Sequence, residues 1–394
     1  MIKIGDLKEL SNFKKQVLTD LSSFKNISVV LFALIVLSAC ATTRPPESAE
    51  FRNVTPSEAV AINDEIMTGN AQPLSTPRET LTILALSGGS ADGAYGVGVL
   101  NGWSKTGSRP SFDIVTGSST GALISVFAFL GPQYDKLLKD LYLSQTNSSI
   151  FRNKGFAGFF SESLFDNAPL KKQIEAIVTE KILDEIAVEH KRGRRLYVAT
   201  TNLDAGELVV WDMGLIASGG AAGRADRVQF FQKILRASAA LPVFFPPVFL
   251  KPLRGVQLRQ AHADGGVKAP VLLSDFLFDQ PARKRELYVI VNGSLSLEDA
   301  NEPVELDLQS IAAKSLSGIT RELTQQLVFR GYVRAKNTNT NFNLTAIPPS
   351  IPPKKDNLSF DSAYLRKIYD AGEAGAQSPD FWWKTPPTLK QNDR

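Results

Sequence analysis

The sequence of 394 residues contains only one cysteine, two histidines and three methionines. A single cysteine excludes an intramolecular disulfide, and two histidines leave little basis for a zinc site, so no metal and no other cofactor is expected. Blocks of one charge are lacking as well, because 44 basic residues stand against 40 acidic ones for a net charge of +4. That surplus is too dilute for a nucleic-acid-binding surface, so no nucleic-acid partner is expected. With 43% hydrophobic and 21% charged residues, the chain is an ordinary globular protein, long enough for one large α/β domain with additional segments or for two smaller domains.

The apolar run Ile27 to Ala39, which precedes the cysteine, is too short to span a bilayer. As a helix, thirteen residues would extend ~20 Å, against a hydrocarbon core of ~30 Å. The run follows a segment of net charge +2 and ends in small residues, the pattern of a secretory signal. Leu37-Ser38-Ala39-Cys40 resembles the bacterial lipoprotein box, in which the cysteine is lipidated and becomes the new N-terminus. The alternative is a buried N-terminal helix with an incidental cysteine.

The lipoprotein resemblance implies a lipoprotein signal peptide over residues 1–39, lipidation of Cys40, and a polar, proline-containing tether over residues 40–80. The signal carries five basic and three acidic residues, so 39 and 37 remain and the mature charge is about +2. Electrostatic attraction to anionic lipid is therefore weak, and we expect the acylated cysteine to hold the protein at the membrane. Ala41 stands where an aspartate would imply inner-membrane retention. The expected location is the bacterial cell envelope, as an outer-membrane lipoprotein facing the periplasm or the surface.

Short apolar runs alternate with amphipathic stretches after this tether. Strands are expected at 81–86, 112–116, 196–201 and 287–291, and Pro169 to Thr179 is typical of the helices between them. This alternation predicts an α/β domain with a mostly parallel central sheet over residues 81–345. Residues 346–394 form a proline-rich segment, a helix around 362–375 and an aromatic tail.

The segment Gly117-Ser118-Ser119-Thr120-Gly121 fits the G-x-S-x-G nucleophile elbow. An expected strand precedes it and an apolar helix follows it, which is the context that this motif requires. The turn would lift the Ser119 hydroxyl out of the sheet, and the helix N-terminus would stabilise negative charge beside it. A plain structural turn is the alternative, because five small residues are a weak signal on their own.

A serine nucleophile needs a positioned base, and neither histidine is well placed to be one. His190 lies in a charged stretch that is typical of a solvated surface. His262 lies two residues before Asp264, and we expect it to project to the opposite side of an extended segment. The base is therefore expected to be a carboxylate.

Three segments in this order, LALSGGSADGAYGVGVL, GSSTGAL and ADGGVKAP, resemble the bacterial patatin-like phospholipases. The resemblance covers about residues 81–292 and implies a patatin-like three-layer α/β/α fold. It further implies a lipid acyl hydrolase that cleaves carboxylic esters with a Ser–Asp dyad through an acyl-enzyme. Residue by residue, it implies Ser119 as the nucleophile, Asp264 as the base, an oxyanion hole at Gly88, Gly89 and Ser90, and motif glycines at Gly93, Gly117, Gly121, Gly265 and Gly266.

The sequence departs from the family pattern at three positions. Ser90 replaces the third glycine of the oxyanion loop, and we expect the hole to survive if the φ angle of Ser90 is not positive. Asp92 stands where an arginine is common, which puts strongly anionic headgroups in doubt as substrates. The residues after Asp-Gly-Gly read VKAP, without the asparagine that is often found there.

Two other functions are compatible with parts of the sequence. The loop around Gly88 could be a dinucleotide-binding turn, but Ser90 stands where the second glycine of that motif belongs. The protein could also be a catalytically silent lipid-binding or scaffolding lipoprotein on the same fold, which the altered loop favours. The substrate, whether phospholipid, lysophospholipid, neutral glyceride or another ester, stays open, as does the oligomeric state.

Two aromatic clusters have two interpretations each. Phe151, Phe156, Phe159, Phe160 and Phe165 could form an apolar lip over the site or pack in the core. Phe381, Trp382 and Trp383 could sit at a bilayer interface or fasten the tail to the domain, and we favour the second.

Overall fold

The computed structural model describes residues 78–219, 226–250, 259–295, 303–352, 354 and 359–387. The side chain of Phe159 is not described. The expected signal peptide, Cys40 and nearly all of the tether lie outside the described residues. No helix within the described part of the chain has both the length and the apolar character that crossing a membrane needs.

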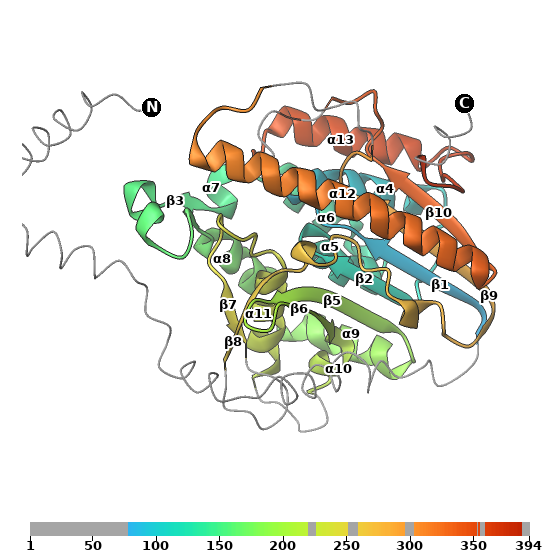
Figure 1. Cartoon of the computed structure of the whole chain (residues 1–394). Helices are drawn as coiled ribbons and strands as arrows, with labels where there is room; N and C mark the ends of the chain where they lie inside the picture. The colour runs from blue at the N-terminus through green and yellow to red at the C-terminus, as the bar shows by residue number, and fades with distance from the viewer. Residues whose placement is uncertain are drawn as a thin grey trace, which may run out of the picture.

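A mostly parallel sheet of eight strands forms the centre of the molecule (Figure 1). Its order is β10-β9-β1-β2-β5-β8-β7, and β6 pairs with β5 off this path. The five strands from β10 to β5 run parallel, whereas β6 and β8 run antiparallel to β5. The bounds are β1 Arg78–Leu86, β2 Ile114–Ser118, β5 Arg195–Asn202, β6 Glu207–Asp212, β7 Val248–Leu250, β8 Gln260–Asp264, β9 Ala282–Val291 and β10 Thr340–Ala346.

Helices cover both faces of this sheet, which confirms the expected α/β/α architecture. The 30-residue helix α12 crosses one face, and α4, α5, α6 and α13 are grouped on the other (Figure 1). The main helices are α4 Gly93–Lys105, α5 Thr120–Leu130, α6 Asp135–Leu143, α8 Ala168–Ile177, α9 Glu180–Lys191, α11 Arg227–Ser238, α12 Leu308–Asn337 and α13 Ser362–Gly375. Shorter elements are α7 Asn147–Ile150, α10 Met213–Ala217, the strands β3 Arg152–Asn153 and β4 Phe165–Asp166, and the 3₁₀ turns η2 Ser90–Asp92, η3 Pro132–Tyr134, η4 Gly155–Phe160, η5 Gly265–Val267 and η6 Asp275–Leu277.

Alternation along the strands divides the core into two layers, because successive side chains of a strand point to opposite faces. In β1, Leu84 and Leu86 join the core under α4, α5 and α13, whereas Ile83 and Ala85 join the core that α12 helps to close. All four residues are fully buried. Burial on both faces explains why this strand reads as a continuous apolar run.

The C-terminal segment packs closely against the helix that follows the glycine-rich loop. A Cβ atom on Gly98 of α4 would collide with the Tyr369 carbonyl oxygen of α13, so the two helix backbones lie in direct contact. The ring of Trp382 lies 4.8 Å from Trp103 and 5.1 Å from Tyr288. Trp382 thus fastens the tail to the domain, as we favoured.

The five phenylalanines between 151 and 165 do not form one surface. Phe151 stacks on Phe165 at 4.6 Å, and Phe165 is buried. Phe156 and Phe160 are exposed and contact each other. Neither the apolar-lip nor the core interpretation therefore holds for the whole cluster.

Candidate active site

Ser119 lies at the sharp turn between β2 and α5, in a strained backbone conformation. Its φ is 55° and its ψ is −127°, values that a residue with a side chain rarely adopts. Two glycines allow this turn: a Cβ atom on Gly117 would lie 2.5 Å from the Gly121 carbonyl oxygen, and one on Gly121 would collide with the Leu86 carbonyl oxygen. The strand–turn–helix context expected of a nucleophile elbow is therefore present.

The backbone of Ser119 is fixed by a residue that sequence reasoning missed. The Ser119 N–H donates to Ser238 Oγ at 3.0 Å, and Ser238 Oγ donates to the Ala199 carbonyl at 2.7 Å. Ser238 ends α11, so this contact links the turn to a helix 119 positions along the chain. A serine in the run RASAALP carries no local signal for such a role.

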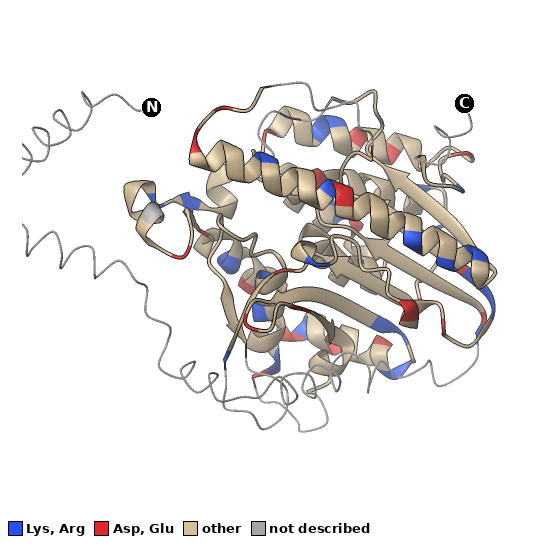
Figure 2. Ribbon diagram, in the orientation of Figure 1, with Lys and Arg blue, Asp and Glu red and all other residues tan. Residues whose placement is uncertain are grey.

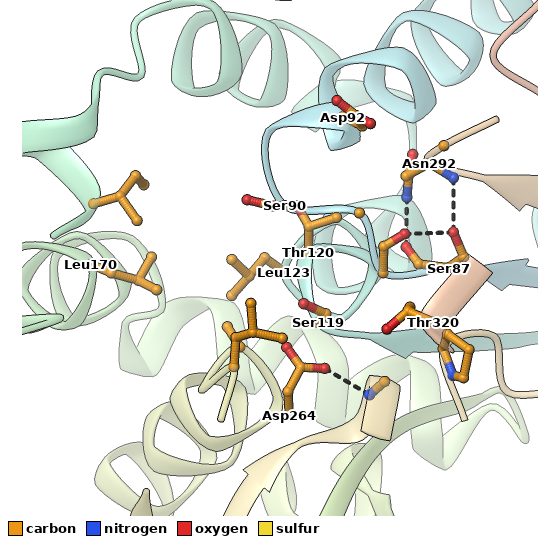
Figure 3. A pocket seen from close by; sticks show the side chains of 18 of the residues that line it. Ser87, Ser90, Asp92, Ser119, Thr120, Leu123, Leu170, Asp264, Asn292 and Thr320 are labelled. Atoms are coloured by element: carbon orange, nitrogen blue, oxygen red, sulfur yellow. Dashed lines mark hydrogen bonds between the residues drawn. The ribbon is translucent and has the colours of Figure 1, made fainter. Parts of the chain in front are cut away.

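Asp264 ends β8 and faces the same site from a different part of the chain. Its carboxylate accepts the Gly266 N–H at 2.7 Å and is almost fully buried (Figure 3). Burial raises the pKa of Asp264 to about 7, although hydrogen bonds from the Ser119 hydroxyl and the Gly266 N–H lower it. Gly265 supports the same turn, because a Cβ atom there would lie 2.5 Å from the Ala199 carbonyl oxygen. The fold thus brings Ser119 and Asp264 together at one site (Figure 3).

The glycine-rich loop after β1 lies beside the Ser119 turn. The Gly88 N–H donates to the Pro270 carbonyl at 2.8 Å, so this donor is occupied. Within the described residues, the N–H groups of Gly89 and Ser90 make no hydrogen bond. Both donors are therefore available to an anion, and Gly93 then begins α4.

Ser90 adopts a positive φ of 54°, so the condition that we set for it at the sequence level is not met. The serine itself takes the left-handed conformation, which costs ~1–2 kcal/mol for a residue with a Cβ atom. The loop is held in place by Asn292, whose side chain donates to the Ser87 carbonyl at 2.7 Å (Figure 3). The same side chain accepts the Gly96 N–H at 3.1 Å. Asn292 follows β9, and the sequence predicted the glycine-rich loop but not the contact of Asn292 with it.

Neither histidine belongs to this site. Residues two apart in a strand share a face, so the expectation that His262 and Asp264 project to opposite sides is wrong. His262 is instead completely buried, its Nδ1 lies 2.9 Å from Thr200 Oγ1, and burial lowers its pKa to about 3. His190 is not solvated as expected: its Nδ1 lies 3.6 Å from Asp212 Oδ1, and burial lowers its pKa.

A cavity of about 490 Å³ opens at Ser119 and Asp264. On the side of Leu123 and Leu170 its wall is aliphatic and aromatic (Figure 3). On the opposite side it is closed by α12, including Thr320. Its apolar wall contains Leu123, Phe127, Leu138, Leu141, Ile150, Leu170, Ile174, Ile177, Leu235, Leu241, Phe244 and Phe245. A volume in this range and a largely apolar lining are typical of pockets for small apolar ligands.

The model of the patatin-like phospholipase family matches residues 84–277, which include the loop, the Ser119 turn and Asp264. The chain therefore contains a patatin domain. No curated protein matches the sequence.

Two solved structures resemble the chain at low identity. VipD from Legionella pneumophila is 13% identical with a TM-score of 0.35, and the match covers 76% of this chain and 67% of that one. A chain in the complex of full-length SpcU with full-length ExoU, from the type III secretion system of Pseudomonas aeruginosa, is 13% identical with a TM-score of 0.34. That match covers 77% of this chain and 52% of the other, so the chain spans about half the length of this second protein.

Proposed function

We propose that the protein is a serine hydrolase of lipid carboxylic esters, with Ser119 as the nucleophile and Asp264 as the base. The observation that carries this proposal is that the partly exposed Ser119 lies beside the buried carboxylate of Asp264. Burial raises the pKa of Asp264 to about 7, the range in which a general base is effective. An ordinary exposed aspartate would be a much weaker base.

The reaction follows from the positions of these groups. Ser119 Oγ attacks the ester carbonyl carbon while its proton passes to Asp264, and the carbonyl oxygen becomes an oxyanion. The free N–H groups of Gly89 and Ser90 are the donors that would hold this oxyanion. When the C–O bond to the alcohol breaks, the alcohol takes the proton from Asp264 and an acyl-enzyme remains. Water then attacks the acyl-enzyme while its proton passes to Asp264. The bond between the acyl carbon and Ser119 Oγ breaks, Ser119 Oγ takes the proton back from Asp264, and the fatty acid is released.

The apolar wall supports a lipid acyl group as the part of the substrate that is transferred. The aliphatic and aromatic side chains that begin beside Ser119 offer little to hydrogen-bond a polar acyl group. Burial of each CH₂ in such a wall contributes ~0.8 kcal/mol. Long acyl chains are therefore expected to be better substrates than short ones.

The decisive variant is Ser119→Ala, and the adjacent Ser118→Ala is its matched control. Ser118 is buried, and its hydroxyl makes no hydrogen bond within the described residues. Fatty-acid release from dispersed phosphatidylcholine and from a soluble medium-chain ester should disappear with Ser119→Ala and persist with Ser118→Ala. A wild-type protein that hydrolyses neither substrate would support the silent lipid-binding scaffold instead.

We further propose that the protein is a bacterial lipoprotein of the outer membrane, anchored through acylated Cys40. The lipoprotein box and Ala41 support this location. Two or more acyl chains give stable anchoring, whereas a single chain is marginal. Intact mass spectrometry of the membrane-extracted protein should show a chain that begins at residue 40 and carries acyl groups, and Cys40→Ser should leave an uncut precursor. A mature chain that starts elsewhere or lacks acyl groups would contradict the anchor.

A further inference from the structure

The negative charge of Asp92, which argued against anionic substrates, is neutralised within the protein. Lys354 Nζ lies 3.2 Å from Asp92 Oδ1, and the lysine side chain is only 8% exposed. The same ammonium donates to the Ser359 carbonyl at 3.1 Å and lies over the Tyr364 ring. Asp92 and Lys354 therefore form an internal ion pair beside the glycine-rich loop, and Asp92 does not present a net charge to a ligand.

Among the described residues, one basic side chain lines the cavity, and it has no acidic partner there. The charged residues in the wall are Asp92, Asp264 and Arg321. Arg321 is partly exposed and makes no hydrogen bond or ion pair within the described residues. The buried Arg109, by contrast, lies 2.7 Å from Asp135. A guanidinium left unpaired at a cavity wall offers its charge to an anion that enters.

Two unused hydroxyls stand next to this guanidinium on α12. Ser317 lies four residues before Arg321, on the same face of the helix, and Thr320 precedes it directly. All three side chains line the cavity, and neither hydroxyl makes a hydrogen bond within the described part of the chain. Figure 3 shows Thr320 on the Ser87 side of Ser119, opposite Leu170. The polar groups of α12 thus face the apolar wall across the nucleophile.

We propose that Arg321, with Ser317 and Thr320, binds the phosphate of a glycerophospholipid whose ester carbonyl lies at Ser119. A planar guanidinium and neighbouring hydroxyls match the oxygens of a phosphate diester. In this arrangement the acyl chain lies along the wall around Leu170, and the headgroup end lies under α12. The inference rests on the proposed ester hydrolysis and narrows its substrate from esters in general to phospholipids. Because α12 lies outside residues 84–277, the phosphate site is built by a part of the chain that the family model does not include.

The test compares two substrates that differ only in the phosphocholine headgroup. Phosphatidylcholine and diacylglycerol with identical acyl chains are presented in the same mixed micelles. Arg321→Met, which keeps an apolar stem of similar length, should raise KM for phosphatidylcholine about tenfold or more and leave diacylglycerol hydrolysis within about twofold. Arg321→Lys should restore part of the loss. Lys314→Met, an exposed cation on the same helix outside the cavity wall, is the matched control and should change neither substrate.

The possible outcomes separate this inference from the proposed function. An equal loss on both substrates in Arg321→Met, with unchanged thermal unfolding, would assign Arg321 a structural role and overturn the phosphate site. Unchanged phosphatidylcholine kinetics would overturn it too. Lysophosphatidylcholine should inhibit the wild type competitively, and equal inhibition by inorganic phosphate would contradict a lipid headgroup as the ligand. If the wild type hydrolyses diacylglycerol but not phosphatidylcholine, only the phosphate site fails; if it hydrolyses neither, the proposed function fails.

Discussion

The region matched by the family model and the region that follows it contribute different things to one cavity. Residues 84–277 contain the glycine-rich loop, Ser119 and Asp264, the groups that we propose carry the reaction. The region from residue 303 onward contributes α12 across the opening, with Arg321, and the Lys354 ammonium beside Asp92. Along α12, one acidic residue, Glu322, stands among five basic residues (Figure 2). The groups that we propose for the reaction are thus positioned by backbone turns, whereas the charged side chains of Arg321 and Lys354 come from a part of the chain that is distant in the sequence.

The largest expected effect on turnover comes from a substitution at Asp264, in the region matched by the family model. Asp264→Asn removes the proton acceptor but keeps an oxygen for the Gly266 N–H, so turnover should fall by two or more orders of magnitude with the fold intact. Steady-state hydrolysis of the soluble ester measures this. Turnover that stays within tenfold of the wild type would exclude Asp264 as the base.

Asp264→Asn should lose activity but increase the free energy of unfolding at neutral and higher pH. Asp264 has a raised pKa in the folded protein, so its neutral form favours folding at low pH and this contribution is lost as pH rises through about 7. Above pH 7, Asn should therefore stabilise the protein by an amount on the order of a few kcal/mol, and by much less at pH 5. Thermal unfolding at both pH values is the measurement. A stability gain that does not depend on pH would show that Asp264 does not titrate in this range.

Activity itself should follow the ionisation of Asp264. The base must be deprotonated to accept the Ser119 proton, so kcat/KM should rise with pH through an apparent pKa of about 7. At one pH unit below that value, activity should be about a tenth of its plateau. A rate profile on a neutral ester measures it. A flat profile between pH 5 and 8 would indicate that the proton acceptor is not this carboxylate.

A smaller effect on activity is expected from removing the charge of Lys354, in the region that follows the family-model match. Lys354→Met leaves the Asp92 carboxylate unpaired beside the glycine-rich loop, which should lower kcat about tenfold and stability by ~1–3 kcal/mol. Asp92→Asn combined with Lys354→Met removes both charges and should recover most of the activity. Lys367→Met, an exposed change on α13, is the control. If the double variant is no better than the single one, the pair does not act through its charge.

The smallest effect on catalysis is expected at His262. His262→Ala removes a buried ring that contacts Thr200 and lies near Trp211, which should cost ~2–4 kcal/mol of stability. Activity per folded molecule should stay within about threefold, because no histidine lines the cavity within the described residues. Activity normalised to the folded fraction measures it. A loss of activity as large as that of Asp264→Asn would favour a mechanism in which a histidine acts as the base.

The sequence was sufficient to predict the parts of the site that are backbone turns. The elbow requires small residues at fixed spacing, so Gly117 and Gly121 mark the position of Ser119 without any tertiary information. The same holds for the strands around 81–86 and 287–291, which are continuous apolar runs because both faces are buried. The expected alternation of strands and helices therefore gave the correct fold class.

The remainder depends on contacts between residues that are distant in the sequence. Nothing near Asp92 indicates that Lys354 lies beside it, and nothing near Ser119 indicates the contact with Ser238. The 30-residue helix α12 was not expected, because apolar and polar residues are not separated onto opposite faces along its length. The positive φ of Ser90 was also not predicted, because a positive φ is normally expected for glycine and not for serine.

The central claim, that Ser119 is activated by Asp264, is tested most directly by covalent labelling with a fluorophosphonate. The wild type should form one adduct that peptide mapping places on Ser119, at a rate that rises with pH through about 7. In Asp264→Asn the same serine should react far more slowly and without that pH dependence. An adduct on another residue, or undiminished labelling of folded Ser119→Ala, would contradict the account.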